Sequence, residues 1–500
     1  MEYQSTRGAL FVSDAQAILQ GIAADGGLFV DPAPGSRPFD WRACLRLAPL
    51  EMQSRILALL LPGIPDMDAL VARAYAGKFE TDALTPVVKV GDDYVVELFR
   101  GPTAAFKDVA LSVLPYLVTA AKAREGQTGQ TVVLTATSGD TGKAALEGFH
   151  DVPGTRIFVF YPDGGVSAVQ RAQMVTQEGG NVTVCAVRGN FDDCQSGVKR
   201  AFAALSGDAA LRERGISLTS ANSINIGRLA PQLVYYFIAY ARLVDSGAIV
   251  PGDKVDYVVP TGNFGDILAG WMAKALGLPV GRLVCASNAN RVLTDFFQSG
   301  VYDRRRPFLK TDSPSMDILI SSNLERLLFY VSGGDSSLVR ACMDGLAREG
   351  AYRFPEALME KLRADFAAYS CTDAEGAETI GSLWREQHYL CDTHTAVAVR
   401  AAQAYRRERA SGAPVVILST ASPYKFPAAV LRALGGESAG DEFEQMDALL
   451  RMTGVPVPAA LAHLRDKRVL HGDVIDVDGM IPYIQAKLTE EYNHDHTCTC

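Results

Sequence analysis

The sequence predicts an α/β fold with mostly parallel sheets. Between residues 131 and 434, short apolar segments of strand length alternate with longer segments of helical pattern. The composition is 48% hydrophobic and 21% charged, which is ordinary for a folded protein. The 500 residues allow about three domains, at roughly 100–200 residues each. In such folds ligands bind where strands end, so we expect functional residues in the loops that follow strands.

Four regions are expected along the chain. Residues 1–85 form a mainly helical domain, with helices over 41–56 and 67–79. Two open α/β domains follow, at 86–250 and 251–435, and residues 436–500 form a C-terminal extension. Residues 85–90 and 94–99 predict a hairpin around Gly91-Asp92-Asp93. The later predicted strands are residues 131–135, 156–161, 181–187, 255–259, 283–286 and 415–418, and the predicted helices are 143–149, 166–178, 193–205, 266–276 and 427–434.

Charge and composition exclude several classes of function. Lys and Arg number 48 against 57 Asp and Glu, a net charge of −9, so we expect no general binding to nucleic acid. The apolar run 56–62 is too short to cross a bilayer. Residues 1–10 lack the apolar segment of a secretory signal, and the nine cysteines have no compact spacing. We therefore expect a cytoplasmic protein that does not associate with membranes.

Lys107 lies in the loop after the predicted strand 94–99, where a helix is expected to begin. The positive end of a helix and the adjacent Ala105 and Phe106 would both lower the pKa of its amine. A lowered pKa is what a Schiff-base lysine requires. A solvated surface lysine is the alternative interpretation, and this loop alone does not decide between them.

Residues 137–142, Thr-Ser-Gly-Asp-Thr-Gly, follow the predicted strand 131–135. Hydroxyl and backbone N–H groups at a helix start form a site for a carboxylate or phosphate. The alternative is that these side chains only cap the helix. Gly142-Lys143 resembles part of a P-loop, but position 137 is not glycine and Ala144 stands where Ser or Thr is required. Nucleotide hydrolysis is therefore not expected.

Residues 261–266, Thr-Gly-Asn-Phe-Gly-Asp, follow the predicted strand 255–259. Their two glycines allow the backbone to wrap a phosphate at the start of the next helix. Asp266 is alternatively the helix N-cap, and the spacing is not that of a dinucleotide fingerprint. A reactive lysine, a hydroxyl-rich loop and a glycine-rich loop together fit pyridoxal phosphate, which requires a lysine and a phosphate site.

The motifs resemble those of the threonine synthases, within the fold type II pyridoxal-phosphate enzymes (tryptophan synthase β-like). The resemblance runs from about residue 3 to about residue 435. The matching segments are Gly26-Gly27-Leu28-Phe29, Glu97-Leu98-Phe99, Gly101-Pro102-Thr103, Phe106-Lys107-Asp108, residues 135–142, residues 220–226 with Arg228, residues 262–266, Ser419-Thr420-Ala421 and Lys425-Phe426. It implies two open, mostly parallel α/β domains with a small N-terminal domain and a C-terminal extension.

The resemblance also implies a role for each matching residue. Lys107 forms the Schiff base with the cofactor and later moves protons, and Thr420 contacts the pyridine nitrogen. The expected cofactor-phosphate residues are Gly262, Asn263, Phe264, Gly265 and Asp266. Those facing the substrate or the cofactor O3′ are Ser138, Asp140 and Thr141, and those holding the substrate phosphate are Asn222, Ser223, Asn225 and Arg228. From the residues alone, the favoured interpretation of 222–228 is a cap on a helix over 229–243 with Arg228 in its first turn, whereas the resemblance favours the phosphate role.

The implied reaction converts O-phospho-L-homoserine and water to L-threonine and phosphate, in a monomer or homodimer. The alternatives are a phospho-lyase that yields 2-oxobutyrate or another keto acid, and a silent binding protein that keeps the fold. Lys143, Thr393 and Ser422 stand where the family more often has other residues. His388 and His394 are expected to be structural. The tail residues His494, His496, Cys498 and Cys500 are not expected to bind a metal.

Overall fold

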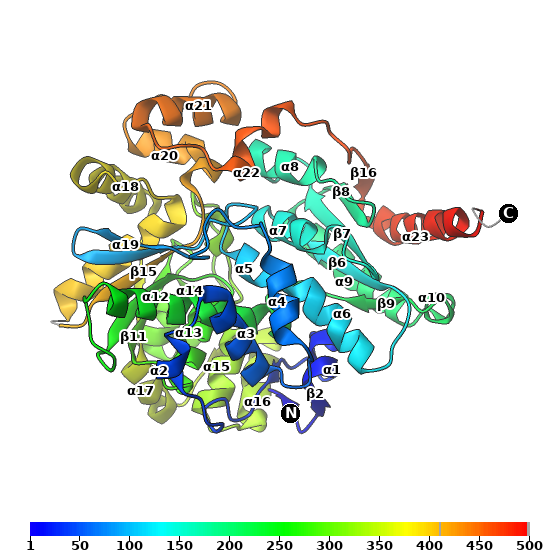
Figure 1. Ribbon diagram of the computed structural model, residues 1–500, viewed down its shortest axis with the longest axis horizontal. Coiled ribbons are helices and arrows are strands. Elements are labelled where there is room, and N and C mark those ends of the chain that lie inside the picture. The colour runs from blue at the N-terminus through cyan, green and yellow to red at the C-terminus, as the bar shows by residue number, and fades with distance from the viewer. Residues whose placement is uncertain (410–411, 498–500) are drawn as a thin grey trace.

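Two largely parallel sheets form the framework of the computed structural model, which describes residues 1–409 and 412–497 (Figure 1). The first sheet has five parallel strands. Its strands, in spatial order, are β16 (Val474–Asp476), β8 (Val182–Arg188), β7 (Thr155–Pro162), β6 (Thr131–Ala136) and β9 (Ser217–Thr219). Alternate residues of β6 enter different hydrophobic clusters, Val133 in one and Val132 and Leu134 in another, so both faces of this sheet are covered.

The second sheet has six strands, parallel except for its β4 edge. In spatial order they are β14 (Phe366–Ser370), β11 (Val280–Ser287), β10 (Val255–Pro260), β15 (Val415–Ser419), β5 (Asp93–Glu97) and β4 (Val87–Val90). The predicted hairpin is confirmed as β4 and β5. Its assignment to the domain 86–250 is wrong, because β5 pairs with β15 and so extends the second sheet. Chain order alone does not reveal this neighbour.

The predicted α/β alternation is confirmed, with boundaries shifted by a few residues. The helices between the strands of the two sheets are α6 (Leu114–Arg124), α7 (Asp140–Phe149), α8 (Ala168–Val175), α9 (Phe191–Ser206), α10 (Ala209–Glu213), α12 (Val234–Asp245), α13 (Gly265–Ala275), α14 (Val292–Ser299), α18 (Asp373–Gln387), α19 (Thr393–Glu408) and α20 (Pro427–Ala433). An insertion between β11 and β14 adds α15 (Leu324–Val331), α16 (Ser336–Arg348), α17 (Glu356–Asp365) and the hairpin of β12 (Val301–Asp303) and β13 (Ala351–Arg353).

The N-terminal region is more than helical. Its helices are α1 (Asp14–Gln20), α2 (Trp41–Cys44), α3 (Pro49–Leu60) and α4 (Met67–Tyr75), and a small antiparallel sheet joins β1 (Glu2–Ser5), β2 (Phe11–Ser13) and β3 (Phe29–Val30). The predicted helix 41–56 is two helices, because Pro49 occupies the first position of α3.

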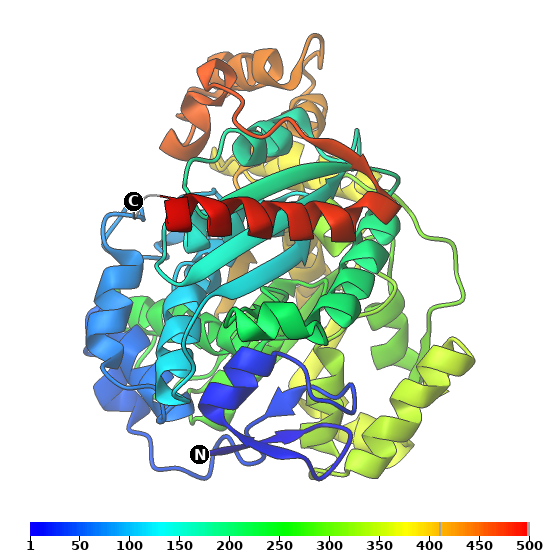
Figure 2. The ribbon, with the colours of Figure 1, turned by 90° about the vertical axis from the view of Figure 1, so that its right-hand side faces the viewer.

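The region after residue 435 packs against the first sheet and extends it. After α21 (Glu442–Thr453) and α22 (Ala459–Ala462), β16 joins the edge of the first sheet, and α23 (Met480–Thr497) lies across that sheet (Figure 2). Met480, Ile484 and Leu488 of α23 are buried with residues of α9. The expected separate extension 436–500 is therefore corrected, since part of it completes the first α/β domain. Cys498 and Cys500 lie outside the described residues. Among the described helices, none combines the length and apolarity needed to cross a bilayer.

Candidate active site

The loops that follow β5 and β15 meet because the two strands are parallel neighbours. Phe106 N donates to Thr420 O at 2.8 Å, and Ser422 N donates to Ala104 O at 3.1 Å. Lys107 begins the short helix α5 (Lys107–Leu111), as predicted. Lys107 and Thr420, far apart in sequence, are thus held in adjoining loops. The Thr420 hydroxyl has no hydrogen-bond partner among the described residues.

Asp108 fixes the shape of the Lys107 loop. Its carboxylate accepts hydrogen bonds from Thr103 N at 2.8 Å and from the Thr103 hydroxyl. A Cβ at Gly101 would lie 2.5 Å from Asp108 Oδ2, so this turn requires glycine. Burial raises the pKa of Asp108 to about 6 against the lowering effect of these hydrogen bonds. The loop therefore presents Lys107 in one defined position.

The Lys107 amine is buried and its pKa is lowered. Burial is the main cause, Asp140 opposes it, and the positive charges of Lys425 and Arg228 lower the pKa further. Lys107 Nζ lies 3.6 Å from Asp140 Oδ2. The predicted direction is confirmed, with burial as the main cause of the lowered pKa, and α5 itself is short, with five residues.

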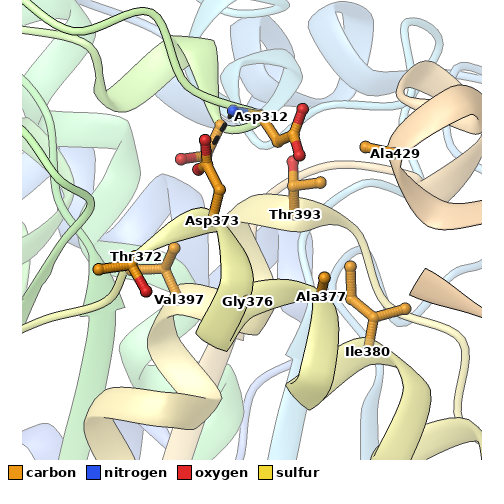
Figure 3. Close-up of a pocket in the computed structure, with 10 residues that line it drawn as sticks. Asp312, Thr372, Asp373, Gly376, Ala377, Ile380, Thr393, Val397 and Ala429 are labelled. Atoms are coloured by element: carbon orange, nitrogen blue, oxygen red, sulfur yellow. Dashed lines mark hydrogen bonds between the residues drawn. The ribbon is translucent and has the colours of Figure 1, made fainter. Parts of the chain in front are cut away.

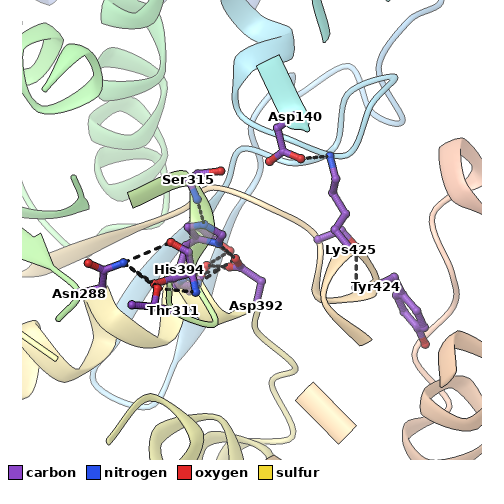
Figure 4. A network of polar contacts seen from close by, with 12 residues as sticks. Asp140, Asn288, Thr311, Ser315, Asp392, His394, Tyr424 and Lys425 are labelled. Carbon is purple, nitrogen blue, oxygen red and sulfur yellow. Dashed lines mark hydrogen bonds and ion pairs between the residues drawn. The ribbon is translucent and has the colours of Figure 1, made fainter. Parts of the chain in front are cut away.

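Asp140 contacts two lysines. Its Oδ1 atom is 2.6 Å from Lys425 Nζ (Figure 4). Oδ1 also accepts from Gln170 Nε2 at 2.9 Å, while Oδ2 faces Lys107. Burial alone would raise the pKa of Asp140, but the two lysines together hold it well below its usual range. Sequence reasoning assigned no role to Lys425, although it lies in a matching segment, because no local pattern indicates that it reaches Asp140.

The hydroxyl-rich loop is held from within by Thr137. Thr137 Oγ1 accepts from Gly139 N at 3.0 Å and from Gly142 N at 2.9 Å. Gly139 is the N-cap of α7 and has no side chain to cap it, but Thr137 bonds a first-turn amide of the helix, so the capping alternative holds for Thr137 and not for Ser138, Asp140 or Thr141. Ser138 is exposed and Thr141 is half-buried. Neither hydroxyl has a partner in the part of the chain that the structure describes, so both can contact a ligand.

The glycine-rich loop leads from β10 into α13. Its carbonyl groups point into the protein: Gly262 O accepts from Ser321 Oγ at 2.6 Å, and Asn263 O accepts from Asn323 Nδ2 at 3.0 Å. A Cβ at Gly262 would lie 2.7 Å from Ser315 O. Within the described residues, no acceptor binds the amide N–H groups of residues 262, 263 or 264. Free amides at the start of an eleven-residue helix fit a phosphate.

Phe264 and Asp266 were expected to hold the cofactor phosphate, but their side chains make contacts within the protein. Phe264 is the N-cap of α13, with φ 65°, and its ring is buried against Phe297. Asp266 is therefore not the N-cap. Its Oδ1 accepts from Tyr235 Oη at 2.6 Å and Tyr236 Oη at 3.0 Å, and burial raises its pKa to about 7. This carboxyl group braces the helix, and only its backbone N–H suits a phosphate.

The segment 222–228 holds a helix-capping residue, Asn225, and a buried cation, Arg228, without a carboxylate partner in the described part of the chain. Asn225 is a helix N-cap, as the capping alternative predicted, but it caps the short α11 (Ile226–Leu229) and not a helix over 229–243. Its Nδ2 donates to Ile18 O at 2.9 Å. Arg228 Nη1 donates to Ala221 O at 2.7 Å, but its buried Nε has no partner. Burial lowers the pKa of Arg228 to about 10. No carboxylate pairs with Arg228 among the residues described, so its guanidinium suits an anionic ligand.

Asn222 and Ser223 are half-buried and directly follow Ala221, whose carbonyl accepts from Arg228. Asn323, which sequence reasoning missed, donates from Nδ2 to Ser223 O at 3.2 Å and to Asn263 O at 3.0 Å. One amide therefore ties the 222–228 segment to the glycine-rich loop. No sequence signal identifies it, because it lies in the insertion between β11 and β14.

His394 has a structural position, as expected. Its Nδ1 lies 2.7 Å from Asp392 Oδ2, and its Nε2 accepts from Ser315 N at 3.1 Å (Figure 4). Ser315 in turn packs on Gly262.

A small pocket nearby is lined by the start of α18 and α19 and by Asp312, whose amide donates to Asp373 (Figure 3). In this pocket of the described structure, no lining residue is one predicted for the site.

Comparisons with known proteins agree with this geometry. Residues 94–421 match the family "Pyridoxal-phosphate dependent enzyme", and residues 395–469 match "Threonine synthase, C-terminal". The family likeness thus extends beyond residue 435, where the sequence resemblance was expected to end. Threonine synthase of Pseudomonas aeruginosa is 40% identical over 446 residues, covering 88% of this chain and 91% of the relative. Threonine synthase-like 1 of Homo sapiens is 38% identical over 84% of this chain, which spans 58% of that protein.

Solved structures show the same framework. Pyridoxal-phosphate-bound threonine synthase from Brucella melitensis has a TM-score of 0.84 and 39% identity, covering 99% of both chains. Threonine synthase from yeast has a TM-score of 0.86 and 34% identity, covering 98% of this chain and 99% of the other. Likeness of this extent, in sequence and in folded framework together, means that the chain belongs to the threonine synthase family of pyridoxal-phosphate-dependent enzymes.

Proposed function

We propose that this protein is a threonine synthase that converts O-phospho-L-homoserine and water to L-threonine and phosphate. The observation that carries the proposal is Arg228, a buried guanidinium with a free Nε, within electrostatic reach of the Lys107 amine. The free amides of residues 262–264 are a second set of donors for an anion. A cofactor phosphate and a substrate phosphate require two such positions around one amine.

The residues present fit pyridoxal phosphate. The buried Lys107 amine would hold its aldehyde carbon, the amides of residues 262–266 would bind its phosphate, and the free Thr420 hydroxyl would contact its ring nitrogen. A side chain at Gly262 would fill space between this loop and Ser315. When bound, the cofactor supplies a sink for the electrons released at the substrate α carbon.

Lys107 suits the role of general base. Its lowered pKa increases the fraction of neutral amine near pH 7, which is the form that accepts a proton. In the overall change, protons leave Cα and Cβ, and phosphate leaves Cγ. Water then supplies the hydroxyl at Cβ, while protons return to Cγ and Cα. Lys107 is the residue we assign to the proton at Cα.

Arg228 is assigned to the leaving phosphate. A charge-assisted hydrogen bond from its free Nε would stabilise the negative charge that develops as the Cγ–oxygen bond breaks. Asn222 and Ser223 are half-buried, directly follow the Ala221 that Arg228 contacts, and are assigned as further neutral donors. Asn225 contributes indirectly, since its side chain caps α11 and thereby fixes the backbone that carries Arg228. The free hydroxyls of Ser138 and Thr141 are assigned to the substrate carboxylate.

The test is product identity. Purified protein loaded with pyridoxal phosphate is supplied with O-phospho-L-homoserine, and threonine, 2-oxobutyrate and free phosphate are measured together. We expect threonine and phosphate in equal amounts. Predominant 2-oxobutyrate would contradict the proposal in favour of a phospho-lyase, and no visible cofactor band would favour a silent binding protein. Lys107→Ala is the control, and it should lose both the band and the products.

We also propose a cytoplasmic protein that acts as a monomer or homodimer. The cytoplasmic location is supported by seven buried free thiols, which are typical of a reducing compartment. They are the cysteines at 44, 185, 194, 285, 342, 371 and 391. Cell fractionation and light scattering of the purified protein test the two parts.

A further inference from the structure

Lys425 is the most completely buried lysine near the site, with no exposed surface. It ends the 3-10 turn η3 (Pro423–Lys425), which follows the Thr420 loop. Its Nζ lies 2.6 Å from Asp140 Oδ1 and donates to Thr103 O at 3.1 Å. Three segments of the site therefore converge on one ammonium group: the Lys107 loop, the start of α7 and the segment after β15.

Asp140 divides its two oxygens between two cations. Oδ1 contacts Lys425 and accepts from Gln170 of α8, while Oδ2 lies 3.6 Å from Lys107 Nζ. A carboxylate facing only Lys107 would be free to turn both oxygens to it. The Lys425 contact prevents this and leaves the weaker, longer contact for Lys107.

We propose that Lys425 is a positioning residue that acts through Asp140 to keep the Lys107 amine ready to lose its proton. It holds one carboxylate oxygen at short range and adds a second positive charge beside the amine. This inference rests on the proposed role of Lys107, but it concerns the amine itself and not the product that is formed.

The charges that face Lys107 come from four elements packed around it. Asp140 of α7 favours its protonated form, whereas Lys425 of η3 and Arg228 of α11 disfavour it. Asp266 of α13 lies within electrostatic reach as well. Removing Lys425 takes away one repulsive charge and frees Asp140 for Lys107. Both effects have the same sign, so the Lys107 amine should hold its proton to higher pH.

The experiment measures the protonation of Lys107 directly. The full chain, freed of cofactor, is labelled briefly with acetic anhydride from pH 6 to pH 11, and acetylation of Lys107 is read by mass spectrometry. The variants are Lys425→Met, Asp140→Asn and the double variant. Lys143→Met is the matched control, because Lys143 is also buried but pairs with Glu147 and not with Asp140.

We expect the midpoint of Lys107 labelling to rise by about 1 pH unit in Lys425→Met and to fall in Asp140→Asn. In the Asp140→Asn background, the added effect of Lys425→Met should be smaller. Lys143→Met should leave the midpoint unchanged. In the cofactor-loaded protein, the pH at which the visible band changes should move upward in Lys425→Met.

An unchanged midpoint in folded Lys425→Met would overturn the proposal. If Lys425→Met does not fold by circular dichroism, Asp140→Asn decides, and an unchanged midpoint there would overturn it equally. A shifted midpoint in a protein that makes no threonine would refute the proposed function and leave this inference standing. Threonine formation with no midpoint shift would do the reverse.

Discussion

Gly262→Ala should weaken cofactor binding, and the structure supplies the magnitude. The new Cβ would lie 2.7 Å from the Ser315 carbonyl oxygen, about 0.7 Å closer than an ordinary contact of 3.4 Å. That oxygen belongs to backbone that His394 holds by accepting from Ser315 N at 3.1 Å, so it cannot simply swing aside. Overpacking of this kind costs about 1–3 kcal/mol. If the loop moves to relieve it, affinity for pyridoxal phosphate falls about 5- to 150-fold.

The assay is titration of cofactor-free protein with pyridoxal phosphate, followed by the visible band. Gly265→Ala in the same loop is the comparison, since its Cβ would make ordinary contacts of 3.5 Å to Asn323 Nδ2 and 3.6 Å to Gln232 Nε2. It should lose less affinity than Gly262→Ala. Gly207→Ala, whose Cβ meets nothing within 4 Å, should match the parent protein. Parent-like affinity and melting temperature in Gly262→Ala would refute the reasoning.

Two further predictions concern stability. Asp266→Asn should raise the melting temperature more at pH 8 than at pH 5. Burial raises the pKa of Asp266 to about 7. The protonated carboxyl therefore adds to the free energy of unfolding below about pH 4, and this contribution is lost as the pH rises through 7. An equal gain at both values would contradict the assignment. Ile484→Ala should lower the free energy of unfolding by about 2–5 kcal/mol, whereas exposed Gln485→Ala on the same helix should change it by less than about 0.5. Urea unfolding measures both variants, and similar losses would show that α23 does not pack on α9 as described.

Local patterns in the sequence predicted the strands, the helices and the loops that carry Lys107 and Gly262. Each of these features depends on a few adjacent residues: apolar runs mark strands, and glycines mark the loop after β10. What local patterns could not predict is which strands become neighbours. β5 lies beside β15 only because the two pair in parallel, and that pairing brings Thr420 next to Phe106. The same limit explains why the sequence predicts a separate extension where β16 joins the edge of the first sheet.

Local sequence patterns also do not predict residues whose role depends on a distant contact. Lys425 and Asn323 are single polar residues whose importance lies in what they reach: Lys425 contacts Asp140, and Asn323 joins Ser223 to Asn263. Neither spacing nor residue type distinguishes them from ordinary capping or surface residues. Asn225 illustrates the opposite case, because its capping role was readable from local sequence and the structure places it there.

Arg228 is a buried cation that lacks a charged partner among the described residues. Buried charges in proteins are normally paired, because an isolated ion loses its hydration without compensation. Lys107 and Lys425 obey this rule by sharing Asp140. Arg228 does not: within the described residues it has only the Ala221 carbonyl, and its Nε is buried without a partner. Burial lowers the pKa of Arg228 to about 10, and we expect an anionic ligand to supply the partner that its Nε lacks. Binding of a phosphorylated substrate should therefore stabilise this protein more than binding of the same substrate without its phosphate.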